Sequence, residues 1–357
     1  LGDVYKRQPI YNAANLVERT LLSALNQTYP NIEFIFVDDK GNSMDIVRRI
    51  IAEHPRRNAV RIIDQKHNQG TGAARNAIVT YATGKYLFTM DCDDVIIPDC
   101  IEILYRKMVE HPVDFVAASF VRKDVQGNIY PGGCQYDDVL VEEGDYAVAQ
   151  YRYGQGKNIF VATWNKLYRT DFLRKNKICC VPHYLIDDPW FTYQVIIRAR
   201  SCRLISDCTL FFTYNPLSVT SVKEQDGYTT FLGEQYLGTQ RLKADYIYSL
   251  AEQPFYPGAL VDLLKMSLYH LYRVYASSKI AESEKEYFLQ SFLEIRFLSP
   301  RHWNFMSKNT YKLLPLLTFY ALPMMVKKGL VKSIVRVDLR SILPVSYTHL
   351  TLPTIRL

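Results

Sequence analysis

The sequence predicts an α/β protein in which a mostly parallel sheet flanked by helices is followed by a mainly α-helical C-terminal region. Up to about residue 119, short apolar runs alternate with amphipathic helical patterns, as strands and their crossover helices do. After about residue 221, long stretches rich in Tyr and Leu replace the strand-like runs. The composition, 48% hydrophobic and 22% charged over 357 residues, is typical of a folded globular chain.

Four short runs of β-branched and aromatic residues indicate strands that are buried on both faces. They lie at residues 32–37, 60–64, 85–90 and 114–119. An earlier strand is expected to lead into Pro9. Because ligands bind at the carboxyl ends of parallel strands, polar residues that follow these runs are the first candidates for a site.

The clearest helical pattern covers residues 98–111, where apolar residues recur at i, i+3, i+4 and i+7. Pro98 suits a first helical turn, and Pro112 ends the pattern. Longer helices are expected at roughly 229–250, 259–277 and 282–297. We therefore expect one domain over residues 9–221 and a helical region over residues 222–344.

The two ends of the chain, residues 1–8 and 345–357, resemble translated adapter sequence. We expect both to be non-native, and fold reasoning leaves them out.

The bulk composition limits the classes of partner. A formal net charge of +7 suits anionic partners such as nucleotides or acidic membranes. The seven cysteines form no CxxC pair and no His pair has zinc spacing, so we expect reduced thiols in a cytoplasmic protein. No apolar run approaches the ~20 residues of a membrane span. Basic and aromatic residues do not interleave as single-stranded nucleic acid requires, so no nucleic-acid partner is expected.

Carboxylates crowd the end of the strand at residues 85–90. Asp91, Asp93 and Asp94 follow it directly, and their mutual repulsion would be costly without a cation. Oxygen ligands of this kind select Mg²⁺ or Mn²⁺, which complete their shells with phosphate oxygens. These three carboxylates, Asp93 and Asp91 among them, are therefore candidate metal ligands. The alternative is an Asp-rich turn that caps the next helix.

Two further polar segments follow earlier strands. Asp38 and Asp39 can accept the N3–H of uracil or the hydroxyls of ribose, or can simply form a turn. Residues 68–76 (NQGTGAARN) superficially match a dinucleotide fingerprint, but Arg75 occupies its third glycine position. Gly70 and Arg75 are instead candidates for orienting a nucleotide phosphate or ribose, with tight helix packing as the alternative.

Taken in order and spacing, five segments resemble family 2 glycosyltransferases. They are residues 9–12 (PIYN), 26–31 (NQTYPN), 37–39 (VDD), 68–76 (NQGTGAARN) and 91–94 (DCDD). The resemblance covers residues 9 to about 221. It implies the GT-A fold, a nucleotide-diphosphate sugar donor, Mn²⁺ or Mg²⁺ as cofactor, and inversion at the anomeric carbon.

On the donor side, the resemblance implies a set of contacts with the nucleotide sugar. The matching residues are Pro9, Tyr11, Asn12, Asp38, Asp39 and Asp91. Asp39 would meet the base and Asp93 would hold the metal. Lys40 departs from the family's usual DDGS run, which reads DDKGNS here, and this weakens the assignment of uracil over other bases.

On the acceptor side, residues 164–168 and 186–191 are similar to family segments in which an acidic pair supplies the catalytic base. Asp188 matches the base, and Asp187 replaces the more usual Glu. From the residues alone, an Asp pair that caps a helix is the alternative. His183 lies nearby and is a weaker candidate.

The apolar segment at residues 313–326 precedes a basic stretch. It is too short to span a bilayer, but it can lie in the headgroup region of an anionic membrane or form a core helix. The basic residues that follow are Lys327, Lys328, Lys332 and Arg336. Peripheral contact with the inner face of the cell membrane is therefore left open.

The expected function is that of an inverting glycosyltransferase, which moves a sugar from a UDP-type donor to a glycan or lipid-linked acceptor in polysaccharide biosynthesis. One alternative is a non-catalytic nucleotide-sugar or glycan-binding protein of the same fold, which would lose metal or base carboxylates. A nucleotidyltransferase would need a Gly-rich phosphate loop after the first strand, and residues 9–15 offer none.

Overall fold

The structure is a computed structural model of the 357-residue chain. It describes residues 4–10, 16–124, 126–182, 187–213, 227–294, 318–319 and 322–334. These residues group into two compact units. The first contains the described residues up to 148 together with 160–213, and the second contains 149–159 together with those from 227 onward. The domain division expected at residue 221 stays a prediction.

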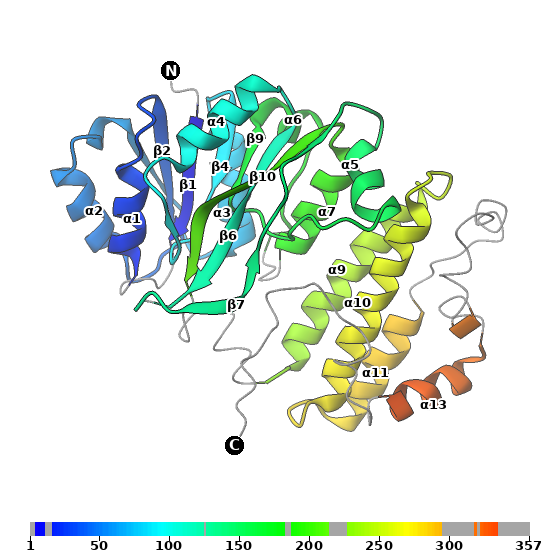
Figure 1. The fold of residues 1–357 in the computed structure, drawn as a ribbon. Coiled ribbons are helices and arrows are strands. Elements are labelled where there is room, and N and C mark those ends of the chain that lie inside the picture. Colours follow the sequence, from blue (N-terminus) through cyan, green and yellow to red (C-terminus); the bar gives the residue numbers. More distant parts are fainter. Residues whose placement is uncertain are drawn as a thin grey trace. The chain divides into compact units, whose positions relative to one another are not determined.

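A mixed sheet forms the centre of the first unit (Figure 1). Its hydrogen-bonded order is β3-β2-β1-β4-β9-β6-β10-β5, with β7 beside β6 and β8 beside β10. The strands are β1 Val4–Ile10, β2 Ile32–Asp38, β3 Val60–Asp64, β4 Tyr86–Thr89, β5 Val95–Ile96, β6 Phe115–Lys123, β7 Ile129–Cys134, β8 Val139–Val141, β9 Lys166–Arg169 and β10 Cys202–Thr213.

The sheet confirms the predicted α/β class. β1 pairs in parallel with β2 and β4, β2 with β3, and β6 with β10, whereas β9 runs antiparallel between β4 and β6. The expected strands correspond to β2, β3, β4 and β6. The sequence pattern did not predict β9 or β10. β9 buries a lysine, Lys166, which interrupts the apolar run. The pairing register of β10 with β6 shifts between Ile205 and Leu210.

Helices cover both faces of this sheet, with α1 and α4 on the near face and α3 on the far face in Figure 1. Their bounds are α1 Val17–Leu25, α2 Met44–Glu53, α3 Gly70–Tyr81, α4 Cys100–Glu110, α5 Ala147–Ala149, α6 Thr170–Lys175 and α7 Asp188–Arg198. α4 confirms the helix predicted over residues 98–111. It buries Ile101, Leu104 and Met108 on one face, as the apolar spacing required.

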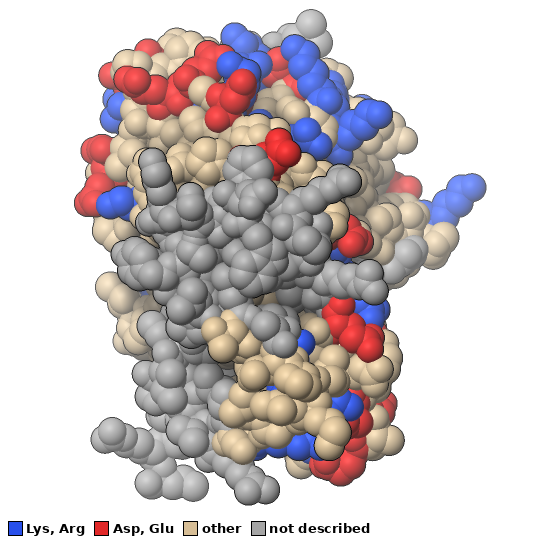
Figure 2. Space-filling model, turned by 90° about the vertical axis from the view of Figure 1, so that its right-hand side faces the viewer, with Lys and Arg blue, Asp and Glu red and all other residues tan. Residues whose placement is uncertain are grey.

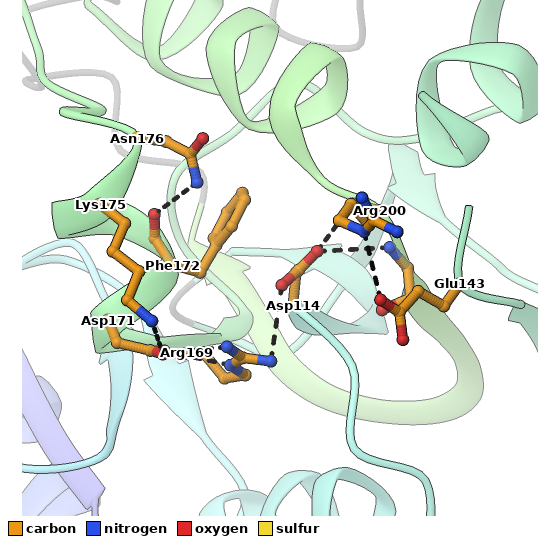
Figure 3. Close-up of polar contacts among 9 residues, drawn as sticks. Asp114, Glu143, Arg169, Asp171, Phe172, Lys175, Asn176 and Arg200 are labelled. Carbon is orange, nitrogen blue, oxygen red and sulfur yellow. Dashed lines mark hydrogen bonds and ion pairs between the residues drawn. The ribbon is translucent and has the colours of Figure 1, made fainter. Parts of the chain in front are cut away.

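At the end of the sheet where β6 and β10 begin, oppositely charged side chains pair with one another (Figure 3). The Asp114 carboxylate accepts the backbone N–H of Arg200 at 2.7 Å and lies 3.8 Å from the guanidinium of Arg169. Arg200 also pairs with Glu143 at 3.2 Å, and Arg169 donates twice to Asp171, at 3.1 and 2.9 Å. These pairs stabilise the edge opposite the predicted site.

A hollow of about 980 Å³ opens at this same edge. Tyr86 and Tyr105 line it together with Lys85, Arg169 and Lys175. It lies at the start of β4, whereas the predicted carboxylates follow the end of that strand. The hollow is therefore distinct from the site at which a donor is expected.

The second unit is built on three long helices that pack against one another: α9 Thr230–Tyr248, α10 Tyr256–Ala276 and α11 Glu282–Leu293 (Figure 1). They confirm the three predicted helices. The π-helical turn η2 Gln150–Gly154 packs against α10, and the backbone carbonyl of Tyr153 lies so close to Gly258 that a Cβ there would stand only 1.9 Å away. Glycine is the residue that this approach permits.

Only part of the apolar segment at residues 313–326 is described. The helix α13 Met324–Ile334 contacts α10 and α11, and its Lys328 and Lys332 pair with Glu286 at 2.5 and 3.2 Å. Met325 is 85% exposed. Within the described ranges, no helix is both long and apolar enough to cross a bilayer. On the face drawn in Figure 2, basic and acidic side chains are interspersed.

Candidate active site

The candidate site lies at the carboxyl edge of the parallel strands. β1 lies between β2 and β4 and pairs with both, Pro9 standing opposite Val37. The carboxylates that follow β2 (Asp38 and Asp39) and those that follow β4 (Asp91 to Asp94) therefore reach the same edge. Strand order alone brings together two of the predicted clusters.

Arg75 connects this edge to the acceptor-side segment. It lies on α3 with 8% of its surface exposed, and its guanidinium contacts three carboxylates. Nη1 lies 2.5 Å from Asp187 and 3.1 Å from Asp188, while Nη2 donates to Asp91 at 2.9 Å. Burial by itself would lower the pKa of Arg75, but these carboxylates raise it well above its usual value. A planar fork with several donors suits this task, and a lysine would not.

The two acceptor-side carboxylates differ in exposure. Asp187 is 1% exposed, and burial raises its pKa to about 6 despite the opposing charge of Arg75. The Asp188 side chain is 21% exposed, and its Oδ1 accepts the backbone N–H of Thr163 at 3.2 Å. Asp187 holds the N-cap position of α7 but makes no side-chain cap hydrogen bond. Its carboxylate faces Arg75 instead, which removes helix capping as the reason for the pair.

Two residues of α3 hold the segment that leads to Asp187. Asn76 donates to the Cys180 carbonyl at 2.9 Å and accepts the Cys180 N–H at 2.8 Å. Gly72 packs so closely that a Cβ there would lie 2.6 Å from the Val181 carbonyl and 3.3 Å from Asp187 Oδ2. Gly72, the second glycine of NQGTGAARN, thus serves close packing against Cys180, Val181 and Asp187.

The carboxylates after β4 divide into different environments. Asp91 pairs with Arg75, and its side chain is 31% exposed. Asp94 is fully buried and accepts the Thr213 N–H at 2.9 Å, and burial followed by the charge of Asp93 raises its pKa well above the usual range. Asp93 is half-buried, and its backbone carbonyl accepts from Arg19 at 3.4 Å. Asp91 and Asp93 are therefore the pair with exposed surface.

The two carboxylates at the end of β2 accept hydrogen bonds from backbone N–H groups. Asp39 accepts the N–H groups of Gln69 at 2.7 Å and Gly70 at 3.1 Å, so it fixes the start of α3. Burial raises the pKa of Asp39, while these hydrogen bonds oppose that shift. Asp38 accepts the N–H of Lys40 at 2.7 Å, and Lys40 has a left-handed φ of 62°. The extra lysine of DDKGNS thus closes a turn onto Asp38.

Three predicted residues, Tyr11, Asn12 and His183, lie outside the described residues. Within the described ranges, no group of three or more His, Cys, Asp or Glu residues is arranged to hold a metal ion. A divalent ion would depend on one or two carboxylates and on donor phosphates, as Mg²⁺ commonly does.

Residues 9–176 match the family described as Glycosyl transferase family 2. These residues, just under half of the chain, are similar to a family 2 glycosyltransferase domain. Glycosyltransferase GlyA of Streptococcus pneumoniae serotype 4 is 30% identical over 169 residues, which cover 45% of this chain and 23% of that protein. The poly(ribitol-phosphate) beta-glucosyltransferase of Bacillus spizizenii is 27% identical over 209 residues, 57% of this chain and 31% of that protein. The chain thus spans less than a third of either relative.

The glycosyltransferase domain also has solved structural neighbours. The crystal structure of S. aureus TarS 1–349 in complex with UDP-GlcNAc gives a TM-score of 0.64 at 18% identity, covering 94% of this chain and 91% of that chain. This likeness confirms the expected GT-A fold.

Sequence reasoning missed three residues that support the site. Arg19 on α1 donates to Thr213 at 2.8 Å beside Asp93, and it belongs to no motif. Asn76 ends the quoted NQGTGAARN run, which was its only signal. Thr163 contributes a backbone N–H, and a backbone contact leaves no trace in residue type.

Proposed function

We propose that the chain is an inverting glycosyltransferase that moves a sugar from a nucleotide-diphosphate donor, UDP in preference to other nucleotides, to a glycan or lipid-linked acceptor in polysaccharide synthesis. The observation that carries the proposal is the Arg75 contact set. One buried guanidinium joins Asp91, on the donor side, to Asp187 and Asp188, on the acceptor side. A sugar-transfer site needs both sides held at a fixed separation.

Asp188 is the proposed catalytic base. The acceptor hydroxyl attacks the anomeric carbon from the face opposite the leaving diphosphate, and its proton passes to Asp188 as the new C–O bond forms and the bond to the diphosphate breaks. Asp188 suits this role because its side chain is 21% exposed, whereas Asp187 is enclosed. The Asp187–Arg75 pair holds the segment in place.

Asp93, with Asp91 beside it, is the proposed site for Mn²⁺ or Mg²⁺. Both side chains keep exposed surface at the open edge, and carboxylate oxygens suit such ions. Asp93 is the residue that the resemblance assigns to the metal, and Arg75 donates to its neighbour Asp91. When bound, the ion would neutralise the charge that develops on the leaving diphosphate.

Support for the donor and acceptor classes comes from the relatives. TarS was solved with UDP-GlcNAc, and one relative is named for glucosylating poly(ribitol-phosphate). On this chain, the resemblance assigns Pro9, Asp38 and Asp39 to the nucleotide. Gly70 lies beside them, since its N–H donates to Asp39, and it is proposed to lie near a nucleotide phosphate or ribose.

Peripheral contact with an anionic membrane is a separate part of the proposal. α13 exposes Met325, Val326 and Leu330 beside basic residues. Two of those basic residues, Lys328 and Lys332, already pair with Glu286. Sedimentation with acidic vesicles that weakens as salt rises would support the contact, and equal binding to neutral vesicles would exclude it.

Donor screening tests the main proposal. The protein is incubated with Mn²⁺, a panel of nucleotide sugars and candidate glycan acceptors, and release of nucleotide diphosphate is measured. We expect release from a UDP-sugar. Tight binding of a nucleotide sugar without any release would favour the alternative, a non-catalytic binding protein of the same fold.

A further inference from the structure

A buried lysine, Lys166, lies beside the candidate base. It is the first residue of β9 and is only 2% exposed. Its Nζ donates to the carbonyl of Ala162 at 2.7 Å. Burying an ammonium group is costly, and an apolar side chain of similar length would fill the same space without that cost. The charge therefore needs a reason beyond packing.

The carbonyl that accepts from Lys166 belongs to the residue just before one that contacts Asp188. The residue after Ala162 is Thr163, whose backbone N–H donates to Asp188 Oδ1 at 3.2 Å. The Thr163 carbonyl in turn accepts from the hydroxyl of Tyr168 at 3.0 Å and from the hydroxyl of Thr89. The carbonyls of Ala162 and Thr163, which flank the Thr163 N–H in the chain, both accept side-chain hydrogen bonds. These bonds hold the N–H that donates to the candidate base.

The chain between this turn and β9 is also fixed. Asn165 adopts a left-handed φ of 55°, which asparagine tolerates better than most residues. Its side chain donates to the carbonyls of Ala118 at 2.9 Å and Ser119 at 3.1 Å, and accepts from the hydroxyl of Thr209 at 2.8 Å. Asn165, held in this way, directly precedes Lys166, whose Nζ bonds to Ala162.

Two titratable groups interact with the Lys166 ammonium. Burial lowers the pKa of Lys166 to about 8, and the charges of Cys134 and Asp188 oppose that shift. Arg75 contacts Asp188 from α3. Asp188 therefore interacts electrostatically with two cations, Arg75 on α3 and Lys166 on β9. Of these two, Lys166 is the one that loses its charge at about pH 8.

We propose that Lys166 is a positioning residue for the candidate base: its ammonium holds the Ala162 carbonyl, so that the Thr163 N–H orients Asp188. The inference rests on the proposed function, since it assigns Asp188 as the base. Lys166 itself touches neither donor nor acceptor in this scheme.

The test compares Lys166→Met with a matched control, Lys243→Met. Lys243 is a second buried lysine, 4% exposed on α9 of the other unit, and burial lowers its pKa to about 8 as well. We expect kcat to fall about 10–100-fold in Lys166→Met, because a misplacement near 1 Å at a catalytic group can cost up to about 10²-fold. KM for the donor and binding of UDP should stay within about twofold of wild type. Lys243→Met should keep its kcat.

The pH profile separates a positioning role from a purely structural one. In the wild type, kcat should fall as pH rises through about 8, because Lys166 loses its proton there. That decline should be absent in Lys166→Met. Lys166→Gln, which can still donate to Ala162 but carries no charge, should recover part of the kcat and show no decline.

Several results would overturn the inference. An active wild type with unchanged kcat in Lys166→Met defeats the inference and leaves the proposed function standing. A wild type inactive with every donor defeats both. If the melting temperature of Lys166→Met is far below that of Lys243→Met, the dependence of wild-type kcat on pH is the deciding measurement. A wild-type kcat that stays constant between about pH 7 and 9.5 rules out the role of the ammonium.

Discussion

Arg75 Nη1 lies 2.5 Å from Asp187 Oδ1, and both side chains are almost completely buried. The pair joins α3 to the start of α7 across 112 positions of sequence. Because neither charge can reach water, each depends on the other, and loss of one leaves an uncompensated buried charge. The predictions below begin from this pair.

Replacing Arg75 by Met should both destabilise the first unit and abolish transfer. Asp187 would remain buried without its partner, at a cost of about 3–5 kcal/mol in the free energy of unfolding. Chemical denaturation and kcat are the measurements. The control is Arg152→Met, because Arg152 is also largely buried and pairs with a carboxylate, Asp262, in the other unit. Arg75→Lys should rescue stability in part and activity hardly at all.

Asp188→Asn should lower kcat by about 10²–10⁴-fold, because an amide cannot accept the acceptor proton. Nucleotide binding, measured by calorimetry, should persist. Asp187→Asn should weaken the contact with Arg75 and give a smaller loss of kcat. The roles would be exchanged if Asp187→Asn proved the more damaging variant. A product that retains the donor's anomeric configuration would exclude single displacement altogether.

Asp93→Asn should abolish transfer without unfolding the protein, since a neutral amide is a weaker ligand for a hard divalent ion. Direct binding of Mn²⁺ in the presence of UDP, followed by calorimetry, gives a readout apart from activity. Asp99→Asn is the control, because Asp99 is exposed and makes no side-chain cap bond to α4. Full wild-type activity in excess chelator would remove the metal from the scheme.

Gly72→Ala should displace the segment that carries Asp187. The added Cβ would lie 2.6 Å from the Val181 carbonyl, a backbone atom that cannot move alone. We expect kcat to fall at least about tenfold, as a shift near 1 Å at a catalytic group can cause. Gly144→Ala is the control, because its Cβ would meet Ala147 at an ordinary 3.6 Å. Equal kcat in the two variants would contradict the packing role.

His270 should make the second unit sensitive to acid. It is 1% exposed, lies 3.2 Å from the Tyr228 hydroxyl and stacks on Tyr236 with ring centroids 3.8 Å apart. Burial, with the charges of Arg273 and Lys243, lowers its pKa well below the usual 6.5. The unfolded chain therefore binds a proton that the folded chain does not, and stability is lost as pH falls below 6.5.

The expected slope for His270 is up to about 1.4 kcal/mol per pH unit in the free energy of unfolding. Urea titrations at pH 7 and pH 5 measure it. His270→Phe keeps the stacking and should lack this part of the slope. His111→Phe, at an exposed position, should leave the slope intact, and a slope that survives in His270→Phe would assign the acid sensitivity to other groups.

Much of the fold was determined by local sequence. The apolar runs that became β2, β3, β4 and β6 are continuous because parallel strands are buried on both faces, and α4, α9, α10 and α11 follow from helical periodicity. The candidate residues that the motifs indicated lie together at the carboxyl ends of β2 and β4. Such features are local, so residue type and spacing alone reveal them.

Other features were decided by the tertiary structure. Arg75 contacts Asp91, Asp187 and Asp188 instead of pointing toward an open phosphate site. This arrangement depends on the packing of α3 against Cys180, Val181 and Asp187. That Lys166 is buried beside the candidate base depends on β9 inserting antiparallel between β4 and β6. Contacts between residues about a hundred positions apart arise only when the chain closes its core, and no local pattern encodes them.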